Sequence, residues 1–169
     1  MAPEFSRPVL LARLPEAGRE TVLRASPAEC AALARRFAIA AVERLEASLL
    51  LRPEPGGGVM VSGRLRADVV QACVVSLEPV PERVDDPVEL RLLPPGTDPS
   101  DDPEGPDEIP IEGDAVDLGE AMAEQLALAL DPYPRAAGAV LPGAEGAPDG
   151  AQGAFGALAA LRRADGTPE

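Results

Sequence analysis

The sequence predicts an α+β domain with an antiparallel, meandering sheet, two main helices at about residues 26–37 and 117–130, a long acidic loop and a flexible C-terminal tail. Runs of alternating apolar and polar residues follow one another with short connections, as in an antiparallel sheet. Two stretches combine helical spacing of apolar residues with capping signals at their ends. The length of 169 residues suffices for one domain with a sizeable core. We expect a single domain over 1–135 and a tail over 136–169.

The first 40 residues favour a hairpin followed by a helix. Residues 7–14 and 20–25 have strand character, and Pro15 and Gly18 lie in the connection between them. Ser26 is a typical N-cap residue, with a proline next and Glu29 as the acid of a capping box. Cys30 lies on this helix, where a buried or half-buried position is expected.

The middle of the chain predicts three strands. Residues 42–51 form the first, and a loop containing Gly56, Gly57 and Gly58 leads to the second. Alternation from Val59 onward predicts a half-buried strand that continues through Cys73 to Pro79, where proline ends or bends it. Apolar and polar residues alternate again over 88–92, which predicts a further strand.

The acidic loop is predicted at 94–108, where six carboxylates are mixed with prolines and glycines and no apolar period exists. We expect it to be mobile and solvated, since the ligand spacing of a calcium loop is absent. Residues 109–111 have the character of a brief edge strand. In the tail, 136–152 should be disordered, and 154–163 should form a short amphipathic segment that docks on its own domain or on a partner.

The second helix has both of its ends marked in the sequence. Asp117 is an N-cap residue, and Glu120 completes an acidic capping box. Asp131 and the prolines that follow it cannot continue the helix. Glu120 and Glu124 are expected to face water, whereas the residues expected to face the core are Leu118, Met122, Gln125, Leu126 and Ala129, with Ala121 and Leu130 at the margins.

Composition excludes several kinds of chemistry. The chain has no lysine and no histidine, so a histidine zinc site, a histidine general base and a lysine Schiff base are excluded. Its two cysteines, Cys30 and Cys73, are expected to be free thiols. No stretch reaches membrane-spanning length and no leader pattern is found, so we expect a cytoplasmic protein without membrane contact.

Charge is distributed unevenly along the chain, which has a net charge of −14. Residues 1–93 hold 13 acidic and 12 basic side chains, whereas residues 94–169 hold 16 and 3. The second half should therefore repel nucleic acid and attract basic partners. Arginines of the first half that remain available for RNA are Arg35, Arg36, Arg44, Arg64 and Arg66.

Catalytic patterns are weak throughout the sequence. The glycines at 56–58 lie between two strands, where a turn explains them better than a phosphate-binding loop. Glu120 and Glu124 are one helical turn apart, but a solvated helix face explains them better than acid and base chemistry. Cys73 is better explained as a strand-core cysteine than as a nucleophile. We therefore expect no enzyme, no cofactor, no metal and no small-molecule substrate.

Two segments resemble the YceD family, also called the large ribosomal RNA subunit accumulation protein family. Residues 70–80 are similar to its "Cys-x-x-(Cys or Thr)-Leu-Glu-Pro" signature, and residues 117–135 match its longest signature. The tail is similar to the family ending "Pro-Phe-x-x-Leu-x-x-Leu-Lys", with Ala154 in place of proline and Arg162-Arg163 in place of lysine. Ser76 replaces the second cysteine that many relatives carry, which puts a dithiol metal site in doubt here.

The resemblance implies a bacterial, cytoplasmic, non-enzymatic factor of ribosome biogenesis, needed for the accumulation or processing of large-subunit ribosomal RNA. It also implies signature residues that are candidates for partner binding. These are Cys73, Leu77, Glu78, Pro79, Asp117, Leu118, Gly119, Glu120, Glu124, Asp131, Pro132, Tyr133, Pro134, Arg135, Phe155, Leu158 and Leu161.

Three hypotheses for the mechanism follow from the residues. In the leading one, the acidic half binds a basic ribosomal protein or an rRNA-processing factor. In the second, Arg64 and Arg66 of the sheet contact precursor ribosomal RNA directly. The third, an unrecognised nuclease that depends on Glu120 or Glu124, is the weakest of the three.

Overall fold

The computed structural model describes residues 3–11, 14–100, 105–111, 113 and 115–140. The chain divides into two units, Met1–Ala136 and Ala137–Glu169. The first unit contains all of the helices and strands named below, which confirms the α+β class. In chain order they are β1 (Pro8–Leu10), β2 (Arg19–Arg24), α1 (Pro27–Arg36), β3 (Ala41–Pro53), β4 (Val59–Ala72), β5 (Pro79–Leu93), β6 (Asp107–Pro110), β7 (Ala115–Asp117) and α2 (Leu118–Ala129).

The main sheet has five strands in the order β2-β3-β4-β5-β6. Strands β2 to β5 pair antiparallel with their chain neighbours, which confirms the predicted meander. The last pair differs, because β6 runs parallel to β5, with Leu92 opposite Ile109. The acidic loop provides the crossover that a parallel pair requires. The prediction of a short edge strand near 109–111 is confirmed, with its start two residues earlier.

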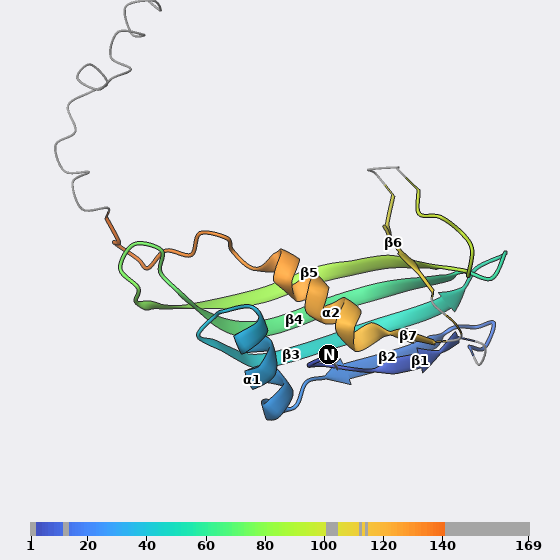
Figure 1. Ribbon diagram of the computed structural model, residues 1–169, viewed down its shortest axis with the longest axis horizontal. Coiled ribbons are helices and arrows are strands. Elements are labelled where there is room, and N and C mark those ends of the chain that lie inside the picture. The colour runs from blue at the N-terminus through green and yellow to red at the C-terminus, as the bar shows by residue number, and fades with distance from the viewer. Residues whose placement is uncertain (1–2, 12–13, 101–104, 112, 114, 141–169) are drawn as a thin grey trace, which may run out of the picture. The chain divides into compact units, whose positions relative to one another are not determined.

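Both helices lie on one face of this sheet (Figure 1), with α1 against β3 and α2 against β4 and β5. Strand β4 shows how alternation divides the faces: Leu65 and Val69 are buried, while Arg66 between them is exposed on the other face. Leu118 and Leu126 of α2 are completely buried against this apolar face. The core is aliphatic, as the low aromatic content of 2% requires.

Both predicted helix boundaries are confirmed to within one residue. Helix α1 starts after Ser26 with a full capping box: the Glu29 N–H donates to Ser26 Oγ and the Ser26 N–H donates to Glu29 Oε2. Helix α2 starts after Asp117, the expected N-cap residue. Within the part of the chain that the structure describes, no helix is long and apolar enough to cross a membrane.

The predicted N-terminal hairpin is wrong. Strand β1 pairs with β7, with Val9 opposite Val116, and these two form a separate two-stranded sheet. Strand β2 instead pairs with β3. The N-terminal strand is held next to β7 by hydrogen bonds to Asp117, which lies 110 residues away from Arg7. Local turn signals at Pro15 and Gly18 contain no information about such a distant partner.

The boundary between the second and third predicted strands is also wrong. Strand β4 ends at Ala72, residues 73–78 form a turn, and β5 begins at Pro79, nine residues before the predicted start. Prolines at 79, 81 and 87 obscured this strand in the sequence. They are tolerated because β6 pairs only with residues 90–93 of β5, so the earlier part of β5 is an edge strand on that side.

The acidic segment and the tail are described only in part. Residues 94–100 have no regular structure, Asp107 and Glu108 belong to β6, and residues 101–104 lie outside the described residues. The predicted amphipathic segment 154–163 and most of 136–152 also lie outside them.

Gly119 allows the N-terminal segment to cross the start of α2. A Cβ atom at this position would lie 2.4 Å from the carbonyl oxygen of Phe5 and 2.8 Å from the amide nitrogen of Arg7. These are backbone atoms and cannot move away without displacing the crossing segment. The family signature glycine is therefore explained by a close approach of two backbones.

We expect Gly119→Ala to destabilise the protein by about 1–3 kcal/mol because the methyl group overpacks this crossing. Helix propensity alone predicts the opposite sign, since alanine is favoured over glycine in helices by about 1 kcal/mol. Urea unfolding, followed by circular dichroism, distinguishes a loss of stability through overpacking from a gain through helix propensity. An unchanged or raised midpoint would contradict the close approach.

Candidate partner-binding surface

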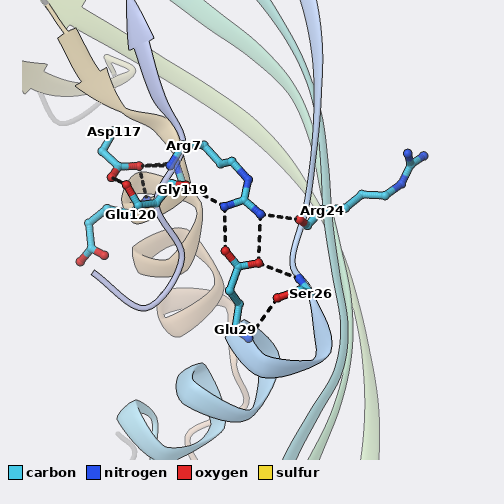
Figure 2. Close-up of polar contacts among 8 residues, drawn as sticks. Arg7, Arg24, Ser26, Glu29, Asp117, Gly119 and Glu120 are labelled. Atoms are coloured by element: carbon cyan, nitrogen blue, oxygen red, sulfur yellow. Dashed lines mark hydrogen bonds and ion pairs between the residues drawn. The ribbon is translucent and has the colours of Figure 1, made fainter. Parts of the chain in front are cut away.

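Asp117 joins the N-terminal segment to α2. Its Oδ1 accepts the backbone N–H groups of Arg7 at 2.6 Å, Gly119 at 3.0 Å and Glu120 at 3.2 Å, and its Oδ2 accepts the Ser6 hydroxyl at 2.5 Å (Figure 2). Burial raises the pKa of this carboxyl group, but the hydrogen bonds outweigh burial and the net pKa is lowered. The ionised carboxylate therefore satisfies donors of two chain segments at once.

Arg7 extends this network to α1. Its guanidinium donates to both carboxylate oxygens of Glu29, at 2.7 and 2.9 Å, and to the carbonyl of Arg24 at 2.9 Å (Figure 2). The hydrogen bonds from Arg7 are the main reason why the pKa of Glu29 falls to about 2. A bidentate pair of this kind fixes orientation as well as distance.

Glu120 does not have its predicted role. Its carboxylate pairs with Arg36 of α1, at 2.6 and 2.9 Å, and Arg36 also reaches Glu4 at 3.1 Å. Asp117 accepts the Glu120 N–H as expected, but the Glu120 carboxylate pairs with Arg36 and does not complete the capping box. The Glu120 side chain is 28% exposed, so its expected water-facing position is confirmed only in part. Glu124, one turn later, is exposed as predicted. Asp117, Leu118, Gly119 and Glu120 consequently have structural explanations within the fold.

The second group of signature residues lies at the end of the sheet, where the turn from β4 to β5 meets the chain after α2 (Figure 1). We call residues 71–79 and 131–136 together the β4–β5 corner. The Val74 N–H donates to the Pro134 carbonyl at 2.9 Å, which joins the two segments. Gln71 adds a second link, since its Nε2 donates to the Asp131 carbonyl at 3.0 Å and to Glu82 at 2.8 Å.

Gln71 was not among the predicted site residues. It is the only polar or charged side chain classed as buried in the described residues. The sequence contains a signal for it: Gln71 continues the odd-numbered, core-facing positions of β4, where Val61, Leu65 and Val69 are apolar. A polar residue in that series requires internal hydrogen-bond partners.

Cys73 is the buried centre of the turn. Its Sγ accepts the backbone N–H groups of Val75 and Ser76, each at 3.4 Å. A backbone hydrogen bond from Ala136, followed by those of Ser76, lowers the pKa of this thiol to about 6. The prediction that Cys73 is buried is confirmed, but it belongs to a turn and not to a strand. Its complete burial keeps the sulfur away from solvent.

The rest of the corner exposes apolar side chains. Leu77 is 78% exposed, Tyr133 is 71% exposed and Val74 is 47% exposed. Leu77 also has a φ angle of 62°, a left-handed conformation that is unfavourable for a branched residue. Pro134 between these residues is buried, so the backbone of the corner is anchored while its apolar side chains face outward.

The sheet arginines lie on the face opposite the helices. Arg64 and Arg66 share the carboxylate of Asp85, at 2.7 and 3.5 Å, and each side chain is about half exposed. A phosphate group would have to compete with this carboxylate. Among the other arginines considered for RNA contact, Arg36 and Arg44 also form ion pairs, with Glu120 and Glu46.

The predicted tail residues Phe155, Leu158 and Leu161 lie outside the described residues. Within the described residues, no group of three or more histidine, cysteine, aspartate or glutamate side chains is arranged to hold a metal ion.

The fold and the corner together define an α+β domain in which two helices cover one face of a sheet and an anchored turn presents apolar side chains at the sheet's end. The family model described as large ribosomal RNA subunit accumulation protein YceD matches residues 61–157, more than half of the chain. The chain belongs to this family. No curated protein and no solved structure gives a significant match.

The Arg7–Glu29 pair makes stability depend on pH. We expect Glu29→Gln to lower the free energy of unfolding by about 1–3 kcal/mol at pH 7, because the folded pKa of Glu29 is about 2 and its ordinary value is 4.5. Since the folded pKa is lowered, this stabilisation is complete above pH 4.5 and is lost as pH falls toward 2. Urea titrations between pH 2 and 7 measure the difference.

Glu16→Gln is the matched control, because Glu16 is an exposed carboxylate in the turn before β2. Its effect should stay within about 0.5 kcal/mol at every pH. A Glu29→Gln effect that does not shrink below pH 4 would contradict the assigned ion pair.

Leu77→Gly should leave the free energy of unfolding within about 1 kcal/mol of the parent. Glycine relieves the left-handed backbone conformation, and this gain offsets the greater flexibility of the unfolded chain. No core contact is lost, since the Leu77 side chain is 78% exposed. Thermal and urea unfolding test this, and a loss above about 2 kcal/mol would mean that Leu77 packs into the domain.

Proposed function

We propose that this chain supports the accumulation of large-subunit ribosomal RNA by binding a basic protein, a ribosomal protein or an rRNA-processing factor, through its acidic half. The protein acts in the cytoplasm as a non-enzymatic factor of ribosome biogenesis. Membership of the YceD family, described by large ribosomal RNA subunit accumulation, supports the general role. The charge distribution supports the mode of action.

The observation that carries the proposal is that the two halves of the chain differ in how their charges are balanced. In the described residues, the arginines that form ion pairs within the chain are Arg7, Arg24, Arg36, Arg44, Arg64, Arg66, Arg83 and Arg91. All of them precede residue 94. Beyond that residue the sequence has 16 acids and only 3 arginines. Among the described acids of this half, Glu108 and Glu120 pair with arginines of the first half, Arg91 and Arg36.

An excess of negative charge of this size favours a basic protein partner over nucleic acid. Carboxylates attract cationic proteins over about 10 Å at 0.1 M salt, and they repel phosphate groups over the same range. Ribosomal RNA is then affected through a protein that itself contacts RNA. Direct RNA binding by Arg64 and Arg66 is the weaker alternative, because both arginines already pair with Asp85.

The test reverses the charge of the acidic loop. We expect replacement of Asp98, Asp101, Asp102 and Glu104 by lysine to reduce binding of salt-released large-subunit ribosomal proteins at least tenfold. Asp107 and Glu108 are left intact, because they contact Gln125 and Arg91. Binding of purified proteins to the immobilised chain at 50–300 mM salt provides the measurement.

A matched control separates loop charge from total charge. The exposed acids Glu16, Glu20, Glu43 and Asp86 of the first half are replaced by lysine in a second variant, which changes the net charge equally. This variant should keep its binding. Equal recovery by the loop variant and the parent would contradict the proposal. Binding of precursor rRNA that weakens on Arg64→Gln and Arg66→Gln would support the alternative instead.

A further inference from the structure

The β4–β5 corner exposes apolar side chains in a rigid setting. Leu77 and Tyr133 are more than two-thirds exposed, and Val74 is about half exposed. The backbone beneath them is held by hydrogen bonds from Val74 to Pro134, from Cys73 to Glu78, and from Leu77 to Cys73. Their exposure therefore does not come from a loose chain end, and contact with another molecule would remove this apolar area from water.

The conformation of Leu77 adds to this argument. A leucine at a φ angle of 62° costs backbone energy that glycine would avoid, and here the side chain gains no burial in return. The strained turn instead leaves the side chain exposed to solvent. Strain of this kind is typical of positions whose geometry serves contact with another molecule.

The surroundings of the corner are acidic. Glu78 and Asp131 are exposed, and Glu82 lies next to them, held by Gln71. Arg135 is the one basic residue in residues 71–82 and 131–136. The backbone N–H of Tyr133 donates to Asp131 Oδ1 at 2.8 Å, so the exposed tyrosine and this carboxylate belong to the same stretch of the surface. A cation of a partner can stack on such a ring.

We propose that the β4–β5 corner is the docking surface for the basic protein partner, and this inference rests on the function proposed above. Apolar side chains of the partner pack against Val74 and Leu77, while an arginine or lysine of the partner lies over Tyr133 and near Glu78 and Asp131. Aromatic side chains surrounded by apolar neighbours are the usual centres of binding energy in protein interfaces.

Other occupants fit this surface less well. An RNA strand would bring its phosphates next to Glu78 and Asp131, which repel them. A second copy of the chain would bring the same acidic rim and a net charge of −14 against itself. Of these three occupants, the basic protein has the charge that complements the rim of the corner.

The experiment uses the full chain and the purified large-subunit ribosomal proteins as the probe. We expect Leu77→Gly and Tyr133→Ser each to weaken binding at least tenfold while the thermal midpoint stays within a few degrees of the parent. Val22→Ser is the matched control, because Val22 is an exposed apolar residue on β2, 52% exposed and outside the corner. It should bind like the parent. A photocrosslinking residue in place of Tyr133 should then join the chain to a basic protein.

The outcomes separate this inference from the proposed function. Loss of binding in the two corner variants and in the loop variant, with Val22→Ser binding like the parent and the crosslink joining a basic protein, supports both. Binding that the loop variant loses but the corner variants keep overturns the corner and leaves the proposed function standing. Failure of every basic protein to bind overturns both. A crosslink between two copies overturns the corner as a partner surface.

Discussion

The carboxylate of Asp117 is the interaction on which the arrangement of this domain depends. It caps α2 and at the same time accepts the backbone N–H of Arg7 and the Ser6 hydroxyl, so the helix and the N-terminal strand are fixed by one side chain. Arg7 then reaches Glu29 in the first turn of α1. Gly119 permits the crossing of the two backbones. A single half-buried ionic network thus connects both helices and β1 (Figure 2).

This network divides the family signature into two parts with different physical meaning. The residues from Asp117 to Glu120 are explained inside the domain, through a cap, a core leucine, a backbone crossing and an ion pair with Arg36. The residues of the β4–β5 corner are not explained in this way, since Leu77 and Tyr133 point into solvent. Cys73 lies beneath them as a buried hydrogen-bond acceptor, and the Ser76 hydroxyl donates to Glu78 at 2.9 Å. The corner is thus a built surface and not a loose turn.

Charge and exposed apolar side chains both support the proposed class of partner. The first half of the chain uses its arginines internally, for example Arg64 and Arg66 with Asp85, and therefore contributes little free positive charge. The second half contains the acidic excess, and its signature segment exposes Tyr133, whose backbone N–H donates to the Asp131 carboxylate. A protein with basic and apolar groups satisfies both features, which is why we place the partner surface at the corner and the long-range attraction in the acidic loop.

Local patterns in the sequence determined the helix boundaries, the β3–β4 hairpin, the aliphatic core and the charge asymmetry, because caps, alternation and composition depend on neighbouring residues. The resemblance to the family, and not a local pattern, marked Leu77 and Tyr133 as signature residues. Only the tertiary structure decided that β1 pairs with β7 and not with β2, that Glu120 meets Arg36, and that Gln71 joins the turn to the chain after α2. These contacts connect residues 60 to 109 positions apart, and long-range pairing is set by the packing of the whole domain. The same reason applies to the corner, whose two segments become one surface only after the sheet and α2 have packed together.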